Sequence, residues 1–321
     1  MGRGIGSADM DMDMDMDMDM DMEAGSSVVL RGGSVRPIGV SPALETQSGE
    51  DWYRGSKWPP TDAVKFWKNA TPKPDGFPRA YWSSYHFSFT VLAEFVRAKN
   101  SSGKAWDSFE GALDAVLPKT KTAIDRELEE LNKLIEYRPG VMAEAMAQRT
   151  NLWAYFTGIF MNDSWSAPYT RDLVEVAGRI GQFQALHYKR RFSRPRPSQF
   201  SPTLFPPIHV PGHAAFPSGH GTEAYLIALC LEKVMPAAAS TPATPSPAGG
   251  SKPVPPPDSS PLRQMAQRIA RNREVLGLHY PSDSKAGKLL AVESLKILMQ
   301  CDSIKHPTKG LIALAKKEWW S

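Results

Sequence analysis

The sequence predicts an all-α fold built as a bundle of helices, and three observations support this. Apolar residues recur at steps of three and four along several segments, as they do on one face of a helix. Ser, Thr and Pro, which favour helix N-termini, precede most of these segments. Segments that alternate apolar and polar residues, as half-buried strands do, are scarce.

Three helices are expected in the first part of the bundle. Residues 119–137 mix Asp and Glu with Lys and Arg, which is typical of an exposed helix with ion pairs. Pro139 suits the first turn of a helix over residues 139–161. Thr170 is expected to cap a helix through about residue 190, with Asp172 in its first turn. The apolar stripe of that third helix comprises Leu173, Val176, Ala177, Ile180, Phe183 and Leu186.

Three further helices are expected in the last third of the chain. Ser218 can cap a helix through Val234, and the last long helix begins between Ser282 and Ser284 and ends near Gln300. Between them, Ser260-Pro261 begins a helix whose inward residues are Leu262, Met265, Ile269 and Val275.

The domain organisation follows from composition. The chain has 321 residues, of which 41% are hydrophobic, enough for a full core. Residues 1–51 contain seven Asp-Met pairs over 9–22 and then a Gly-, Ser- and Pro-rich stretch, so we expect a disordered tail and linker. A single catalytic domain over 52–321 follows, interrupted by a Pro-, Ala- and Ser-rich loop insertion at 236–261.

Charge, cysteine content and hydropathy exclude several protein classes. The two cysteines, Cys230 and Cys301, have no ligand or disulfide spacing. The net charge is +4, but the first 23 residues are strongly acidic and the remainder carries +11, which favours anionic ligands. The uncharged run Ala224–Leu231 is far shorter than the about 20 residues of a membrane span. No basic and apolar leader opens the chain, so we expect a cytoplasmic protein without a membrane span.

Three segments combine residues with complementary chemistry. The first runs from Lys189 to Arg196-Pro197, the second is Pro217-Ser218-Gly219-His220, and the third runs from Arg273 through His279 to Asp283. Lys189, Arg196 and Arg273 supply three positive charges that suit an oxyanion. Ser218-Gly219 at a helix start adds a hydroxyl and backbone N–H groups.

The two histidines and the aspartate complete a reactive set. One histidine can attack or ligate a central atom while the other moves a proton. Asp283, four residues after His279, can accept its ring N–H and fix the tautomer. Each residue alone also has an ordinary explanation, because Ser218 and Asp283 can be helix caps, and Lys189 and Arg196 can be a solvated helix end.

Taken in order, the three segments resemble the signature of the type 2 phosphatidic acid phosphatase and vanadium-dependent haloperoxidase superfamily. That signature reads Lys-x6-Arg-Pro, then Pro-Ser-Gly-His, then Ser-Arg-x5-His-x3-Asp, and here only the Ser is replaced, by Asn272. The resemblance covers about residues 140–300. It implies an α-helical bundle of the acid phosphatase and haloperoxidase type, with an oxyanion pocket at its centre.

The resemblance implies two activities. In a haloperoxidase, vanadate is the cofactor, and halide, hydrogen peroxide and an organic acceptor are the substrates. His279 would then ligate the vanadium and His220 would move a proton; Lys189, Arg196, Ser218, Gly219 and Arg273 would hold the oxygens. In the alternative, a soluble phosphatase, the same residues bind a phosphoester, and His279 attacks phosphorus to form a phosphohistidine.

His213 favours the haloperoxidase. The segment from Pro211-Gly212-His213 to His220 resembles Pro-Gly-His-x-x-aromatic-Pro-Ser-Gly-His of vanadium bromoperoxidases, in which this histidine would tune the vanadate pocket. The ordinary alternative is a loop histidine bonded to backbone. Most lipid phosphatases of the superfamily span membranes and the secreted acid phosphatases carry a signal peptide, and neither feature is visible here.

Two other classes of protein agree less well with the sequence. A basic helical protein that binds nucleic acid agrees with the +11 charge, but no reader motif or stacking platform is present, so we expect no nucleic-acid partner. A catalytically inactive scaffold disagrees with the complete charged set, which would be costly to keep buried without a ligand. The sequence leaves open a homo-oligomer.

Overall fold

The computed structural model describes residues 79, 82–160, 167–235 and 260–319. The chain divides into two units, and the helices below belong to the larger one, which is described from Ser83 to Trp319. The tail and linker expected at 1–51, residues 52–78 at the start of the expected domain, and the insertion as far as residue 259 lie outside the described residues.

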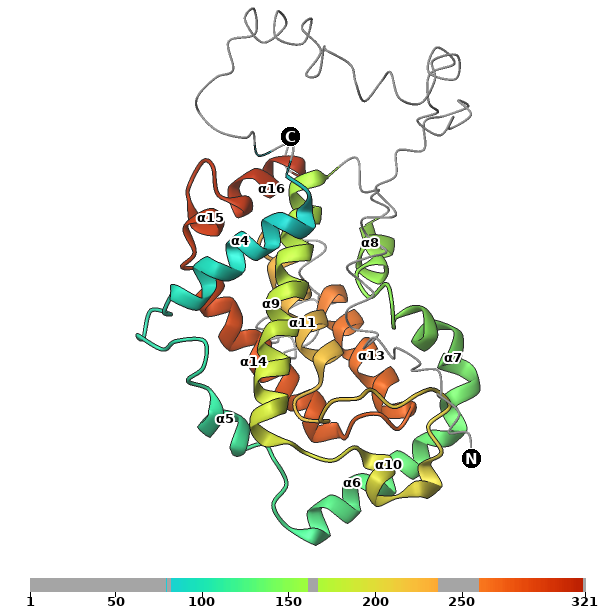
Figure 1. The fold of residues 1–321 in the computed structure, drawn as a ribbon. Helices are drawn as coiled ribbons and strands as arrows, with labels where there is room; N and C mark the ends of the chain where they lie inside the picture. Colours follow the sequence, from blue (N-terminus) through green and yellow to red (C-terminus); the bar gives the residue numbers. More distant parts are fainter. Residues whose placement is uncertain (1–78, 80–81, 161–166, 236–259, 320–321) are drawn as a thin grey trace, which may run out of the picture. The chain divides into compact units, whose positions relative to one another are not determined.

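Every regular element in these ranges is helical, which confirms the all-α class (Figure 1). No strand occurs in the described ranges. The larger helices are α4 (Ser84–Arg97), α6 (Lys121–Leu134), α7 (Arg138–Ala147), α8 (Ala154–Phe160), α9 (Pro168–Phe192), α11 (Gly219–Leu231), α13 (Pro261–Val275), α14 (Pro281–Leu298) and α16 (Leu311–Trp319). Short helices are α5 (Glu110–Asp114), α10 (Pro197–Phe200) and α15 (Asp302–Lys305), with 3₁₀ turns η2 (Ile135–Tyr137) and η3 (Pro202–Leu204).

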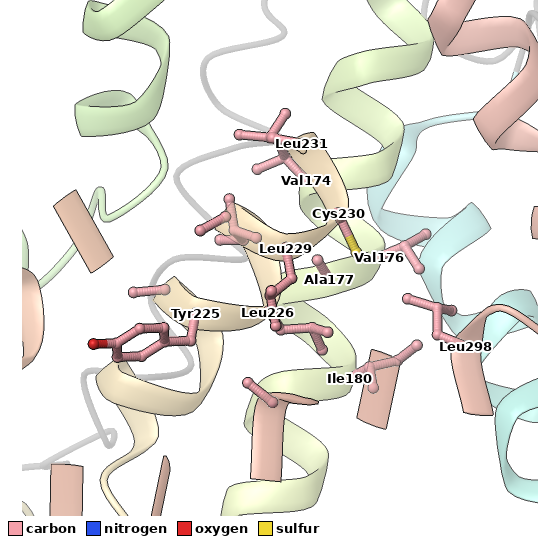
Figure 2. Close-up of a cluster of buried hydrophobic side chains, with 14 of the residues drawn as sticks. Val174, Val176, Ala177, Ile180, Tyr225, Leu226, Leu229, Cys230, Leu231 and Leu298 are labelled. Atoms are coloured by element: carbon pink, nitrogen blue, oxygen red, sulfur yellow. The ribbon is translucent and has the colours of Figure 1, made fainter. Parts of the chain in front are cut away.

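Helix α11 is the central element of the bundle. It packs against α9, α13 and α14 (Figure 1). Its residues are buried on all sides except at His220, as expected for a helix that is apolar around its whole circumference. Side chains of α11 such as Leu226 and Cys230 interdigitate with Ala177 and Ile180 of α9 (Figure 2). The start of α11, which carries Ser218 and His220, is therefore fixed by the core.

Two glycines allow the neighbouring helices to approach α11 closely. A Cβ at Gly181 of α9 would lie 2.8 Å from the Cα of Glu223, and one at Gly287 of α14 would lie 2.9 Å from the carbonyl oxygen of Ser218. Both contacts are with backbone, which cannot move aside as a flexible side chain can. The close approach brings α9 and α14 against the first turns of α11.

The prediction that Thr170 caps the long helix over residues 170–190 is wrong. Helix α9 begins two residues earlier, at Pro168, and Asp172 lies beyond its first turn. Glu318 of α16 takes over the capping, because its carboxylate accepts the backbone N–H groups of Tyr169 (2.7 Å) and Thr170 (2.8 Å). A carboxylate at this end is also favoured by the helix dipole.

The single helix expected over residues 139–161 is two helices, α7 and α8, joined by residues 148–153. Pro139 does lie in the first turn of α7, as predicted. The break is explained by Asn151, whose side-chain oxygen accepts the N–H of Ala154 (3.1 Å) and so competes with a continuous helical backbone. This connection brings Gln148 and Arg149 to the candidate active site.

The other helix starts agree closely with expectation. Ser218 and Ser260 cap α11 and α13 by accepting the N–H groups of Gly221 and Arg263. The last long helix, α14, begins at Pro281, one residue before the predicted range. The apolar stripe of α9 stops short of Leu186, which is 41% exposed. No helix in the described part of the chain is long and apolar enough to cross a membrane.

Candidate active site

A tight turn between α13 and α14 brings the third segment together. Gly277 has a φ of +73°, a conformation that side chains disfavour, and it ends α13. The N–H of Leu278 reaches back to the carbonyl of Arg273 at 3.0 Å. The chain therefore reverses within a few residues, which places Arg273 and His279 on the same side of the turn.

His279 and Asp283 form a buried pair. Nδ1 of His279 lies 3.0 Å from Oδ2 of Asp283, and His279 is 4% exposed while Asp283 is fully buried. On the other side of the ring, Nη1 of Arg196 lies 3.2 Å from Nε2 of His279. A guanidinium has donors only, so Nε2 accepts this hydrogen bond, and the ring proton is on Nδ1, which donates to Asp283.

The surroundings of His279 keep it neutral. Burial, followed by the positive charges of Arg196 and Lys189, holds the pKa of His279 well below the ordinary value of 6.5. A neutral imidazole with its proton on Nδ1 has a basic lone pair on Nε2. Nε2 can bond to an electrophilic central atom once the Nη1–H of Arg196 that it accepts turns away.

Asp283 is held by Arg194, which is held in turn by Glu127, and the sequence analysis singled out neither residue. Nη1 of Arg194 donates to Oδ1 of Asp283 (2.6 Å), and Nη2 donates to Glu127 (2.8 Å). The guanidinium also stacks on the ring of Tyr280, 3.6 Å from the ring centre. Burial raises the pKa of Asp283, and the charge of Arg194 opposes that rise. We assign the ionised form, because Asp283 accepts three hydrogen bonds.

The first segment approaches from the end of α9. Helix α9 ends at Phe192, with Ser193 in the left-handed conformation, and the chain then runs to Arg196. Nζ of Lys189 donates to the carbonyl of Ala214 at 2.8 Å, and Nε of Arg196 donates to the carbonyl of His213 at 2.9 Å. Both cations are buried, with Lys189 2% and Arg196 3% exposed.

The second segment contributes the N-terminus of α11. Ser218 is fully buried and its hydroxyl caps the helix. His220 is half-buried, and its Nε2 lies 3.2 Å from the carbonyl oxygen of Gln148, so Nε2 carries the proton and Nδ1 is the basic nitrogen. The first turn of a helix attracts anions through its N–H groups and its dipole.

These segments surround one small cavity. Its lining is Arg149, Ile208, His209, Pro211, His213, Gly219, His220, Arg273, Leu278 and His279, and the centre of a water molecule has about 30 Å³ of space in it. Among the predicted site residues, Gly219, His220, Arg273, His279 and His213 thus face it. Four predicted residues do not line it. Arg196 and Asp283 contact His279, which does, and Lys189 and Ser218 lie next to Gly219. No carboxylate of the described residues appears in this lining.

His213 belongs to the site rather than to a separate loop. Its Nδ1 lies 2.9 Å from Nη2 of Arg196, which donates to it, and 3.2 Å from the carbonyl oxygen of Ala214. Arg196 therefore bridges His213 and His279 with one guanidinium. The ordinary alternative, a histidine bonded only to backbone, does not describe this position.

The one departure from the family signature changes a contact. The side-chain amide of Asn272 donates to Gln148 and Glu144, each at 3.0 Å. Its neighbour Arg273 is 1% exposed and donates to the carbonyl of Ala145. Asn272 therefore ties α13 to the end of α7 and to the connection that follows it, a contact beyond the reach of a serine side chain.

Sequence reasoning missed Arg149, Gln148, Glu127 and Arg194. Arg194 lies between Lys189 and Arg196 in the first segment, and this position is the only feature of the sequence that indicates a place at the site. Glu127, in the helix predicted as an exposed ion-paired surface, is 155 residues away from its partner Ser282 and gives no local signal. Gln148 and Arg149 were placed inside a continuous helix, which concealed them.

No protein-family model matches the chain, and no curated protein matches it significantly.

Proposed function

We propose that the protein is a vanadate-dependent haloperoxidase, in which hydrogen peroxide is reduced to water and a halide is oxidised to a hypohalous acid with uptake of one proton. The observation that carries the proposal is the neutral His279, whose Nδ1 is fixed by Asp283. It lies in a cavity to which the described residues contribute arginines and no carboxylate.

The chemistry of these donors fits an oxyanion. Arg196, Arg273 and Lys189 place three buried positive charges within the site, which favours an anionic ligand. Guanidinium groups match the geometry of oxygens on tetrahedral or trigonal anions. His279 would hold vanadate through Nε2, while the cations and the start of α11 would hold its oxygens. When bound, vanadate supplies the Lewis acidity that activates the peroxide.

Asp283, His220 and His213 would each have a separate role in this reaction. Asp283 orients His279 and keeps the proton on Nδ1. His220 has a basic Nδ1 because its Nε2–H is engaged by Gln148, so it can take up and return a proton next to the cavity. His213 and Arg196 are joined by a hydrogen bond, so His213 influences the orientation of Arg196.

A phosphatase of the same superfamily is the second candidate, and the neutral Nε2 of His279 supports it equally. In that reaction His220, protonated on Nδ1, gives this proton to the leaving alcohol as Nε2 of His279 attacks phosphorus. Water then cleaves the phosphohistidine and returns a proton to Nδ1. The cationic surroundings would stabilise the charge on the equatorial oxygens.

The test is a pair of assays on the full chain after metal removal and addition of orthovanadate. Peroxide-dependent bromination of a phenol dye is compared with hydrolysis of p-nitrophenyl phosphate by the vanadate-free protein. We expect bromination, lost in His279→Ala and retained in a matched control, His306→Ala, which changes an exposed histidine outside the site. Hydrolysis without bromination would support the phosphatase instead. Neither activity in the wild type would refute both.

A further inference from the structure

Arg149 is a cation of the cavity that the motif residues do not explain. It lies in the connection between α7 and α8 and lines the same cavity as His220, Arg273 and His279. Its Nε is buried, yet within the described part of the chain it has no hydrogen-bond partner. The described residues also include no carboxylate that forms an ion pair with it.

Each of the other arginines of the site donates to at least one acceptor that the structure shows. Arg194 donates to two carboxylates, Arg196 to the carbonyls of His213 and Leu278, and Arg273 to the carbonyl of Ala145. Desolvating a charged donor without an acceptor is costly, so a half-buried guanidinium with an unused N–H indicates a missing partner. The described lining of the cavity holds no carboxylate, so an anion that enters the cavity would supply such a partner.

The backbone next to Arg149 is held firmly. Gln148 is fully buried, its carbonyl oxygen accepts from His220, and its side chain accepts from Asn272 at 3.0 Å and donates to Glu144 at 2.8 Å. Helix α13 packs against both α7 and α8 (Figure 1). The connection therefore keeps Arg149 beside the cavity instead of leaving it on a loose surface loop.

We propose that Arg149 is a further anion-binding residue, which contacts the same oxyanion that bonds to His279. The inference rests on the proposed function and adds a cation from outside the three motifs. The cavity leaves about 30 Å³ for the centre of a water molecule, and Arg149, His220, Arg273 and His279 all line it. The ligand class is a multiply charged tetrahedral oxyanion, and orthovanadate and inorganic phosphate share that chemistry.

The experiment measures affinity for orthovanadate and, separately, for inorganic phosphate by calorimetric titration of the full chain. The variants are Arg149→Gln, Arg149→Lys and a matched control, Arg126→Gln, which removes the same charge from an exposed position on α6. A charge-assisted hydrogen bond predicts a loss of about 10- to 100-fold in affinity for Arg149→Gln. Arg149→Lys should lose less, and the control should stay within about threefold.

The outcomes separate this inference from the proposed function. If the wild type binds an oxyanion, if His279→Ala weakens vanadate binding, and if both Arg149 variants bind like the wild type, the role of Arg149 is refuted and the proposed function stands. If the wild type binds neither anion, both fail. Thermal melting of Arg149→Gln should match the wild type closely, since its Nε has no acceptor to lose among the described residues. A loss of anion affinity in both Arg149→Gln and the control would also overturn the inference, since it would then reflect net charge.

Discussion

Replacement of Asp283 by Asn tests whether the buried carboxylate fixes the reactive histidine. Three donors converge on its two oxygens: Nη1 of Arg194 on Oδ1 at 2.6 Å, and the N–H of Tyr280 and Nδ1 of His279 on Oδ2, each at 3.0 Å. An Asn side chain offers one oxygen and one NH₂ group. Whichever way the amide turns, its NH₂ faces at least one of these donors.

The structure allows the magnitude to be worked out. Breaking a buried ion pair by removing one partner costs about 3–5 kcal/mol. Glu127 still accepts from Arg194 at 2.8 Å in the variant, so the guanidinium keeps one carboxylate and the cost should lie near 3–4 kcal/mol. For a domain of this size that is a fall in Tm of roughly 6 to 16 °C. If the NH₂ faces His279, the ring must shift its proton to Nε2 and loses its reactive lone pair. In the well-studied serine protease triad, the corresponding change lowers kcat by about 10⁴-fold.

The assay combines thermal melting with vanadate affinity and turnover, and Glu127→Gln is the matched control. That variant neutralises the other carboxylate on Arg194, while it keeps the bond between Asp283 and His279. We expect it to lose stability but to keep oxyanion binding within about tenfold, since its effect on His279 is indirect. Equal losses of binding in both variants, or an Asp283→Asn protein with wild-type turnover, would refute the orienting role of Asp283.

Two further predictions concern pH and packing. The folded-state pKa of His279 is held well below 6.5, so below pH 6.5 the unfolded chain binds a proton that the folded protein does not. The free energy of unfolding should therefore fall as the pH drops below 6.5, with a contribution of up to about 1.4 kcal/mol per pH unit that urea titrations of His279→Gln should no longer show. Gly181→Ala should destabilise the protein by about 1–3 kcal/mol, because its Cβ would meet the backbone of Glu223, whereas Gly178→Ala on the same helix meets nothing within 4 Å and should stabilise by about 0.5–1 kcal/mol. Chemical denaturation of the pair checks this, and a shared sign would contradict the close approach of α9 and α11.

The sequence predicted well what depends on local signals. The starts of α11 and α13 follow from Ser218 and Ser260, each of which caps a helix through its own side chain. The all-α class follows from apolar periodicity in the same local way. The motif residues lie in three short segments, and the structure brings Gly219, His220, Arg273 and His279 from two of them to one cavity.

What the sequence could not predict depends on contacts between distant residues. Glu318 caps α9 from 148 residues beyond Thr170, and no local pattern around either residue indicates this. Arg194 reaches Glu127 across 67 positions, so the outer support of Asp283 was invisible. The break between α7 and α8 was missed because Asn151 looks like an ordinary polar residue within a helical pattern.

Oδ2 of Asp283 makes both contacts that were expected of this residue, the helix-capping contact and the hydrogen bond to His279. Oδ2 accepts the N–H of Tyr280 at the start of α14, which is a helix-capping contact, and it accepts Nδ1 of His279 at the same distance of 3.0 Å. Capping the helix therefore fixes the carboxylate that fixes the histidine. Because α14 packs directly on α11 through Gly287, the same contact sets His279 relative to the first turn of α11. The interactions that hold the bundle together thus also set the positions of His279 and of the start of α11, and a change that loosens the start of α14 should disturb both.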